Sequence, residues 1–407
     1  MSLLKEMYMR TTILPAIFLA FAFCHAEPWP RHTIDKSSRG ADGVRLADVN
    51  GDGYQDITTG WEQGNVIRVY VSPGPDKTKG KWSTVTVGKV GSPEDAVFAD
   101  LDGDGAIDVV SSCEGRIRTV FVHWAPGDRA KYLDEKAWKT EAIPVTEKKS
   151  SWMFAVPMQV DGKRGIDIVI ASKGRNARVG WLESPENPRD LATWKYHHMQ
   201  DAGWVMSLRK LDVDGDGLED MIVSDRRGKG SGTYWLKHPG KDKVSAARNW
   251  ARHDIAGNGK EVMFVGVWAS KEGTLDVVTP LRAGSILWSR GQSGEGEVKW
   301  QTSEFTNDRF TGSGKAAAIG DIDLDGNLDL VYALHTGKDR KKPGVSWLSY
   351  KDAITDKVWK LHDISGERGV KFDRLELIDM DADGDLDVLT CEEVDQLGVF
   401  WYENPAR

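Results

Sequence analysis

Short acidic segments carry the most distinctive chemistry of this sequence, and DLDGDGAID at residues 100–108 is one of them. Its four aspartates lie within nine residues, so their carboxylates repel one another unless a positive charge lies between them. Alternate side chains of a tight loop, with a glycine at the sharp turn, form a ligand set that suits Ca²⁺. We therefore expect a calcium ion here, and a metal-free turn held by the aspartates is the alternative.

The same pattern, D-x-[DN]-x-[DN]-G-x-x-D, occurs in five intact copies that begin at residues 48, 100, 212, 321 and 379. Positions 1, 3, 5 and 9 supply the expected ligands. They are Asp48, Asn50, Asp52, Asp56, Asp100, Asp102, Asp104, Asp108, Asp212, Asp214, Asp216, Asp220, Asp321, Asp323, Asp325, Asp329, Asp379, Asp381, Asp383 and Asp387. An EF-hand is excluded, because position 12 of the first copy is Thr59 where an EF-hand needs Glu.

Two further copies have lost ligands, at residues 159–167 and 268–276. In the first, Lys163 replaces the acid at position 5, so we expect its ammonium to neutralise Asp161 and Asp167. The second has Trp268, Ser270 and Glu272 at ligand positions. The sequence therefore predicts about five structural calcium ions rather than seven.

The seven copies recur at intervals of 52 to 59 residues, which makes them markers of a repeat. Each last aspartate opens a short β-type run, a second run usually ends in Trp, a third begins with Trp, and a fourth precedes the next acidic segment. Four short strands per unit predict an all-β, seven-bladed β-propeller with four-stranded antiparallel blades over residues 27–407. The last unit lacks one strand, and WPRHTID at 29–35 matches it, so we expect the N-terminal strand to complete the last blade and close the ring.

These repeats resemble the FG-GAP/VCBS family, whose seven-bladed propellers include the head of integrin α subunits. The resemblance covers residues 27–407 and implies the same fold. RVGWLESPENPRDLATWKYHH and the terminal WYENP are also similar to segments of the propeller domain of aldos-2-ulose dehydratase, which modifies carbohydrates. That similarity is patchy, and no cupin-like region follows here.

The first 26 residues predict a secretory signal peptide, because Lys5 and Arg10 precede an apolar run at 13–23 and Ala26 offers a small residue for cleavage. We therefore expect a secreted or periplasmic protein with no membrane span.

The net charge of -8 argues against nucleic-acid binding. We expect a monomer with Cys113 and Cys391 as free, buried thiols.

A second periodic position suggests a ligand face. The residue six places after each last aspartate is ionisable in all seven repeats. These residues are Glu62, Glu114, Lys173, Arg226, Arg282, His335 and Glu393. They fall in turns on the face opposite the acidic loops, together with Trp61, Trp152, Trp204 and Phe310. Aromatic and charged side chains together suit a sugar, and a solvated charged rim is the alternative.

Four other histidines are expected to be structural. They each follow a strand-opening Trp by three residues, and they are His32, His197, His253 and His362.

Three functions remain open at this stage. The first is an exported module that binds carbohydrate, such as an acidic polysaccharide, or another extracellular ligand on this face. The second is a lyase or dehydratase, with His335 as the candidate base and Arg226 and Arg282 neutralising a carboxylate or enolate. The third is a protein-interaction propeller of the adhesion type. We favour the first, because the sequence holds no compact nucleophile motif or His-rich metal site.

Overall fold

A computed structural model describes residues 27–271, 273–294, 297–306, 312–337, 339, 341–350 and 359–407. The predicted signal peptide at 1–26 lies outside these residues, and so do Glu272 and Phe310. No helix in the described ranges has the length and apolarity needed to cross a membrane. Cys113 and Cys391 are free and buried, as predicted.

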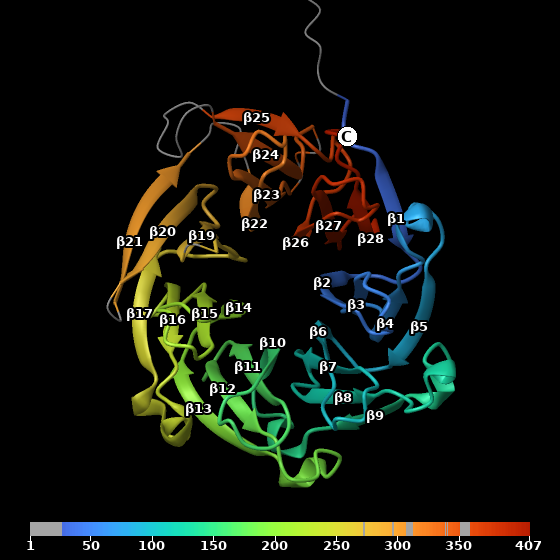
Figure 1. Cartoon of the computed structure of the whole chain (residues 1–407), viewed down its shortest axis with the longest axis vertical. Coiled ribbons are helices and arrows are strands. Elements are labelled where there is room, and N and C mark those ends of the chain that lie inside the picture. The colour runs from blue at the N-terminus through green and yellow to red at the C-terminus, as the bar shows by residue number, and fades with distance from the viewer. Residues whose placement is uncertain are drawn as a thin grey trace, which may run out of the picture.

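Seven four-stranded antiparallel sheets surround a central axis like the blades of a propeller (Figure 1). Blades 1 and 2 comprise β2 (Ala41–Ala47), β3 (Asp56–Trp61), β4 (Val66–Val71), β5 (Ser83–Gly88), β6 (Pro93–Ala99), β7 (Asp108–Cys113), β8 (Val120–Trp124) and β9 (Lys139–Ala142). Blades 3 and 4 comprise β10 (Ser151–Met158), β11 (Asp167–Lys173), β12 (Arg178–Glu183), β13 (Lys195–Asp201), β14 (Val205–Leu211), β15 (Asp220–Asp225), β16 (Gly232–Lys237) and β17 (Ala251–Ala256). The first strand of each blade lies nearest the axis (Figure 1).

The remaining three blades follow the same order. Blades 5 and 6 comprise β18 (Gly266–Ala269), β19 (Thr274–Pro280), β20 (Ile286–Gly294), β21 (Glu297–Phe305), β22 (Ser313–Gly320), β23 (Asp329–His335), β24 (Val345–Ser349) and β25 (Lys360–Asp363). Blade 7 comprises β26 (Phe372–Ile378), β27 (Asp387–Glu392), β28 (Gly398–Tyr402) and β1 (Arg31–Asp35). The predicted all-β, seven-bladed propeller is therefore confirmed.

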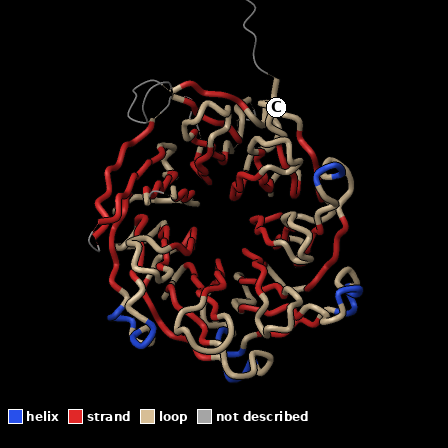
Figure 2. The backbone as a smooth tube through the Cα atoms, viewed as in Figure 1, coloured by secondary structure: helices blue, strands red, loops and turns tan. Residues whose placement is uncertain are grey.

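Short 3-10 helices are the helical segments of the described chain, and they lie at the outer rim (Figure 2). They are η1 (Pro75–Lys77), η2 (Arg129–Lys131), η3 (Glu135–Ala137), η4 (Pro144–Thr146), η5 (Leu191–Thr193), η6 (Lys241–Lys243) and η7 (Ala247–Asn249). Six of them lie in the connection between the third and fourth strands of a blade.

The N-terminal strand closes the ring, as the sequence predicts. Strand β1 pairs antiparallel with β28 (Figure 1). In this pairing His32 lies opposite Trp401. Just before it, Trp29 is buried and its backbone N–H donates to the carbonyl of Ile364, at 3.0 Å. The first and last described strands thus share one sheet, which leaves no unpaired edge on β28.

The periodic histidines belong to the scaffold. His197 stacks on Trp181 with 4.5 Å between ring centroids, and His362 stacks on Trp347 at 3.9 Å. Each pair joins the third and fourth strands of one blade, where the residues lie directly opposite each other. The interpretation of these histidines as structural is therefore confirmed.

Candidate functional site

In six of the seven acidic motifs, the last aspartate accepts a backbone N–H group of its own loop. Asp108 is fully buried, and its Oδ2 accepts from the backbone N–H of Leu101 while its Oδ1 accepts from that of Ala125. The distances are 3.2 and 2.8 Å. Asp167 of a damaged copy makes the equivalent bonds to Val160 and Ser184. This aspartate therefore has a structural role even where the metal ligands have been lost.

Carboxylates come close together in most of the intact loops. In four of the five loops, three carboxylates place one oxygen each within 4.8 Å of the others. These sets are Asp100, Asp102 and Asp108; Asp212, Asp214 and Asp220; Asp321, Asp323 and Asp325; and Asp379, Asp381 and Asp387. The glycine at position 6 allows the turn, because Gly105 has a φ of 82° and Gly384 one of 96°, which L side chains rarely adopt. The first loop differs, because its Asn50 donates to Asp52 at 2.9 Å.

The charge of these loops is incompletely satisfied within the described chain. Asp214 Oδ1, Asp321 Oδ1 and Asp381 Oδ1 are buried and have no hydrogen-bond partner there. Basic side chains approach the same loops. Lys237 pairs with Asp216 at 3.2 Å, and Lys79 pairs with Asp381 at 3.0 Å. Such loops attract positive charge from any available source.

The two damaged loops contain ion pairs of their own. Lys163 pairs with Asp161 at 3.2 Å, as the sequence predicts. The prediction that it also neutralises Asp167 is wrong, because that carboxylate accepts backbone N–H groups instead. In blade 5, Asp276 accepts from Arg290 at 2.9 and 3.0 Å and from the indole of Trp288 at 2.6 Å.

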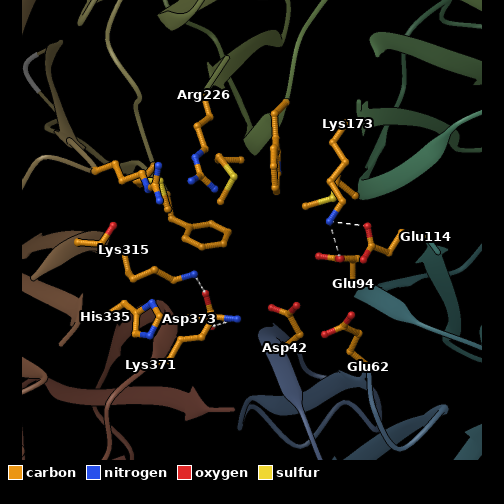
Figure 3. A pocket seen from close by; sticks show the side chains of 17 residues that line it. Asp42, Glu62, Glu94, Glu114, Lys173, Arg226, Lys315, His335, Lys371 and Asp373 are labelled. Carbon is orange, nitrogen blue, oxygen red and sulfur yellow. Dashed lines mark hydrogen bonds and ion pairs between the residues drawn. The ribbon is translucent and has the colours of Figure 1, made fainter. Parts of the chain in front are cut away.

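At the opposite end of the second strands lies a cavity of about 350 Å³, which we call the central cavity (Figure 3). Six of the seven periodic ionisable residues line it. They are Glu62, Glu114, Lys173, Arg226, Arg282 and His335. Glu393 is absent from the lining but pairs with Lys371, which lines the cavity. The structure thus places side chains from six blades around one space.

The first strands of the blades contribute a second set of residues to the lining of the central cavity. These residues were not predicted from the sequence. Asp42, Glu94, Met153, Met206, Lys315 and Asp373 all line the central cavity. Each lies six residues before the first residue of its acidic motif. This periodicity was therefore available in the sequence, as a second fixed distance from the same markers.

One side of the central cavity is acidic. Figure 3 shows Asp42, Glu62, Glu94 and Glu114 gathered there, with Lys173 bonded to the last two. The ammonium of Lys173 lies 2.9 Å from Glu94 Oε1. Burial, and then Asp42, raise the pKa of Glu94 well above its ordinary value. Burial and Asp373 raise the pKa of Asp42 to about 7. A single lysine does not neutralise this group, so it favours protons or ligands that donate hydrogen bonds.

The other side is basic. Arg226 Nε is buried and has no hydrogen-bond partner in the described chain, and it lies 3.9 Å from Glu261 Oε1. Burial and the nearby Arg282 lower the pKa of the Arg226 guanidinium. Lys315 pairs with Asp373 and lies 5.3 Å from the centroid of the Phe264 ring. The space between these groups favours an anion or a hydrogen-bond acceptor.

His335 lies on the basic side, beside Lys315 and Lys371 (Figure 3). Burial and these two lysines lower the pKa of its imidazole below the ordinary 6.5. The imidazole is therefore uncharged at neutral pH and able to accept a proton.

Of the three tryptophans expected on this face, the structure places one at the central cavity. Trp204 lines it. The placement of Trp61 and Trp152 on the surface is corrected, because both are buried in the core with exposed fractions of 0% and 2%. The indole of Trp61 donates to the Tyr70 hydroxyl, and that of Trp152 donates to the Thr146 carbonyl. Neither is a platform for a ligand in this structure.

Comparisons with known proteins agree with the fold. Residues 48–111, which span the first two acidic loops, match the FG-GAP-like repeat family. No curated protein sequence matches the chain. The crystal structure of BBS1N in complex with ARL6DN is similar with a TM-score of 0.51 and 10% identity, over 93% of this chain and 97% of that one. The Saccharomyces cerevisiae Sqt1 structure follows with a TM-score of 0.48 and 13% identity, over 92% and 98%. Residues 48–111 are therefore similar to an FG-GAP-like repeat, and they lie within a seven-bladed β-propeller.

Proposed function

We propose that this propeller binds an acidic carbohydrate in the central cavity. The observation that carries the proposal is Arg226, whose buried Nε lacks a hydrogen-bond acceptor in the described chain while Arg282 and Lys315 line the same space. A ligand carboxylate supplies hydrogen-bond acceptors and negative charge to the two guanidinium groups that line this space, and a guanidinium binds it better than an ammonium does.

The rest of the lining suits the remainder of a sugar. Met153, Met206, Met263 and Phe264 supply apolar surface for the C–H face of a sugar ring. Asp42, Glu62 and Glu114 accept hydrogen bonds from hydroxyl groups. A volume of about 350 Å³ lies within the range of small-ligand sites, roughly 300–1,000 Å³.

Binding is tested with an array of acidic and neutral glycans, followed by the double variant R226A/R282A. We expect retention of acidic glycans and its loss in the double variant, because two cations leave the basic side together. Arg116→Ala is the matched control, since this exposed arginine lies in a turn on the same face but outside the lining. Unchanged binding in the double variant contradicts the proposal. A protein partner becomes the better hypothesis if no glycan is retained.

His335 favours a second candidate, elimination on the bound sugar. Its uncharged imidazole lies in the same cavity as Arg226 and Arg282. In this scheme His335 takes the proton next to the sugar carboxylate, the electron pair forms a carbon–carbon double bond, and the oxygen of the leaving group departs. The two arginines stabilise the enolate. Incubation of each bound glycan, followed by ultraviolet absorbance of the new double bond in wild type and His335→Ala, distinguishes this activity from binding alone.

We also propose that the five intact loops hold calcium, which stabilises the face opposite the central cavity. The converging carboxylates and the buried, unpartnered oxygens of Asp214, Asp321 and Asp381 fit a hard divalent cation. The loop of blade 5 lacks such a set, because Trp268 and Ser270 stand at two of its ligand positions and Asp276 pairs with Arg290. The ion supplies charge neutralisation and links the ends of each loop.

A further inference from the structure

A second hollow of about 680 Å³ adjoins the central cavity, and we call it the outer groove. Its lining is Lys260, Glu261, Leu281, Arg282, Ala283, Ser285, Glu304, Gly312 and Ser313. Arg282 and Ser313 line both spaces. The two hollows therefore meet at these residues.

The outer groove leads away from the propeller axis over blade 5. Arg282 follows β19, which lies towards the centre of the ring, and Glu304 lies near the end of β21, the outermost strand of that blade (Figure 1). Lys260 and Glu261 belong to the connection between blades 4 and 5. A chain molecule that begins in the central cavity thus has a path to the rim.

The outer groove is lined by polar side chains whose contacts with one another a ligand can replace. Glu304 accepts from the Ser285 hydroxyl at 2.7 Å and pairs with Lys260 at 3.2 Å. Arg282 donates to Glu261 at 2.8 Å. The Lys260 and Glu304 side chains are 46% and 44% exposed, so their ion pair competes with water and contributes at most about 1 kcal/mol. Hydroxyl and carboxylate groups of a ligand can replace such contacts at little cost.

We propose that the outer groove is a second subsite, which binds the next unit of an acidic oligosaccharide whose end unit lies in the central cavity. This proposal rests on the proposed function. Arg282 contacts the ligand where its two units join, and Lys260, Ser285 and Glu304 bind the outer unit. The ligand is therefore a chain rather than a single sugar acid.

Isothermal titration with galacturonate and trigalacturonate tests the proposal. We expect the trimer to bind at least tenfold more tightly than the monomer. The double variant K260A/E304A removes both partners of the outer pair without changing the net charge, and it lowers trimer affinity towards that of the monomer while leaving monomer affinity unchanged. K89A/E135A is the matched control, because Lys89 and Glu135 form an exposed pair, at 2.6 Å, outside both hollows.

The outcomes separate the two proposals. Equal affinities for monomer and trimer, or full trimer affinity in K260A/E304A, overturn the outer subsite and leave binding in the central cavity standing. Loss of both affinities in R226A/R282A, beside a selective loss in K260A/E304A, supports both. The absence of any binding by either probe overturns the proposed function and the subsite with it.

Discussion

The guanidinium carbon of Arg226 lies 4.6 Å from the centroid of the Trp204 ring. The Lys173 ammonium lies 4.9 Å from the same centroid and the Arg227 guanidinium carbon lies 4.8 Å from it. One indole therefore contacts basic side chains from blades 3 and 4. Cation–π attraction is strongest for Trp, and it orients the cations without neutralising them. Trp204 therefore acts as a support for the basic side of the central cavity rather than as an open stacking platform.

The position of Trp204 depends in turn on Asp225, which leads to the first prediction. The buried Asp225 carboxylate accepts the backbone N–H groups of Gly203 and Trp204 at 2.9 and 2.7 Å. Asp225→Asn replaces one acceptor oxygen by a donor, so we expect about 1–3 kcal/mol of lost stability. We also expect a shift in Trp fluorescence and weaker binding of acidic glycans. Asp201→Asn is the control, because that side chain is 94% exposed. Identical fluorescence and affinity in both variants would show that Asp225 does not position the site.

A chelator tests the proposed calcium ions. At a free calcium concentration one hundred times the dissociation constant, each occupied site stabilises the fold by about 2.7 kcal/mol. We therefore expect chelation to lower the melting temperature, and added calcium to restore it. Elemental analysis should find one ion fewer in Asp381→Ala, which loses a buried oxygen with no hydrogen-bond partner in the described chain. Asp161→Ala, in a loop that holds Lys163, should leave the count unchanged. Equal metal content in the two variants contradicts the assignment of the loops.

The closing strand makes a third prediction. Trp29 is 8% exposed and packs in the largest core cluster, so Trp29→Ala should lower the free energy of unfolding by about 3–5 kcal/mol. Deletion of residues 27–36 removes the strand itself and should lower the melting temperature further. Thr33→Ala lies on the same strand but is exposed, and it should change stability by less than about 0.5 kcal/mol. Chemical denaturation of the three variants measures these differences. Wild-type stability in the deletion variant would mean that the ring does not depend on β1.

The fold was accessible from the sequence because each repeat carries the same marker at the same place. In six of the seven repeats the buried last aspartate opens a strand and bonds to its own loop, and its recurrence in the sequence gives the number of blades and their register. The turn position of Glu62 and Arg226 followed from that marker. Asp42 and Lys315 lie at an equally constant distance from it, but they fall within strands, and the sequence alone does not reveal which strand side chains face the axis.

The direction of the Trp61 side chain and the ion pair in blade 5 could not be predicted from the repeat pattern, because both depend on the three-dimensional structure. Trp61 and Trp204 both fall near turns, but the Trp61 side chain lies in the core. A turn position does not fix the direction of a side chain. The pair between Asp276 and Arg290 depends on the register of β19 against β20, where the two residues lie opposite each other. Sequence distance alone does not reveal that register.

The acidic side of the central cavity predicts a pH dependence of stability. Burial and the neighbouring Asp373 raise the pKa of Asp42 to about 7, from 3.8 in an exposed chain. Lys371 and Lys315 act in the opposite direction, and Glu62 adds to the repulsion. Because the folded state binds more protons than the unfolded state between about pH 4 and 7, this carboxyl stabilises the protein at low pH. That contribution is lost as the pH rises through 7.

Asp42→Asn should remove this dependence. At saturating calcium, urea unfolding should show a smaller fall in stability from pH 5 to pH 8 in the variant than in the wild type. At pH 8 the variant should be the more stable protein, by about 2–4 kcal/mol, because it buries no charge beside Asp373. Part of the slope will persist, since the pKa of Glu94 is raised in the same direction. Asp76→Asn, at an exposed position, serves as the control. If Asp42→Asn and Asp76→Asn give the same slope as the wild type, the carboxylate of Asp42 is not held against Asp373, and the acidic side of the cavity is more solvated than the structure indicates.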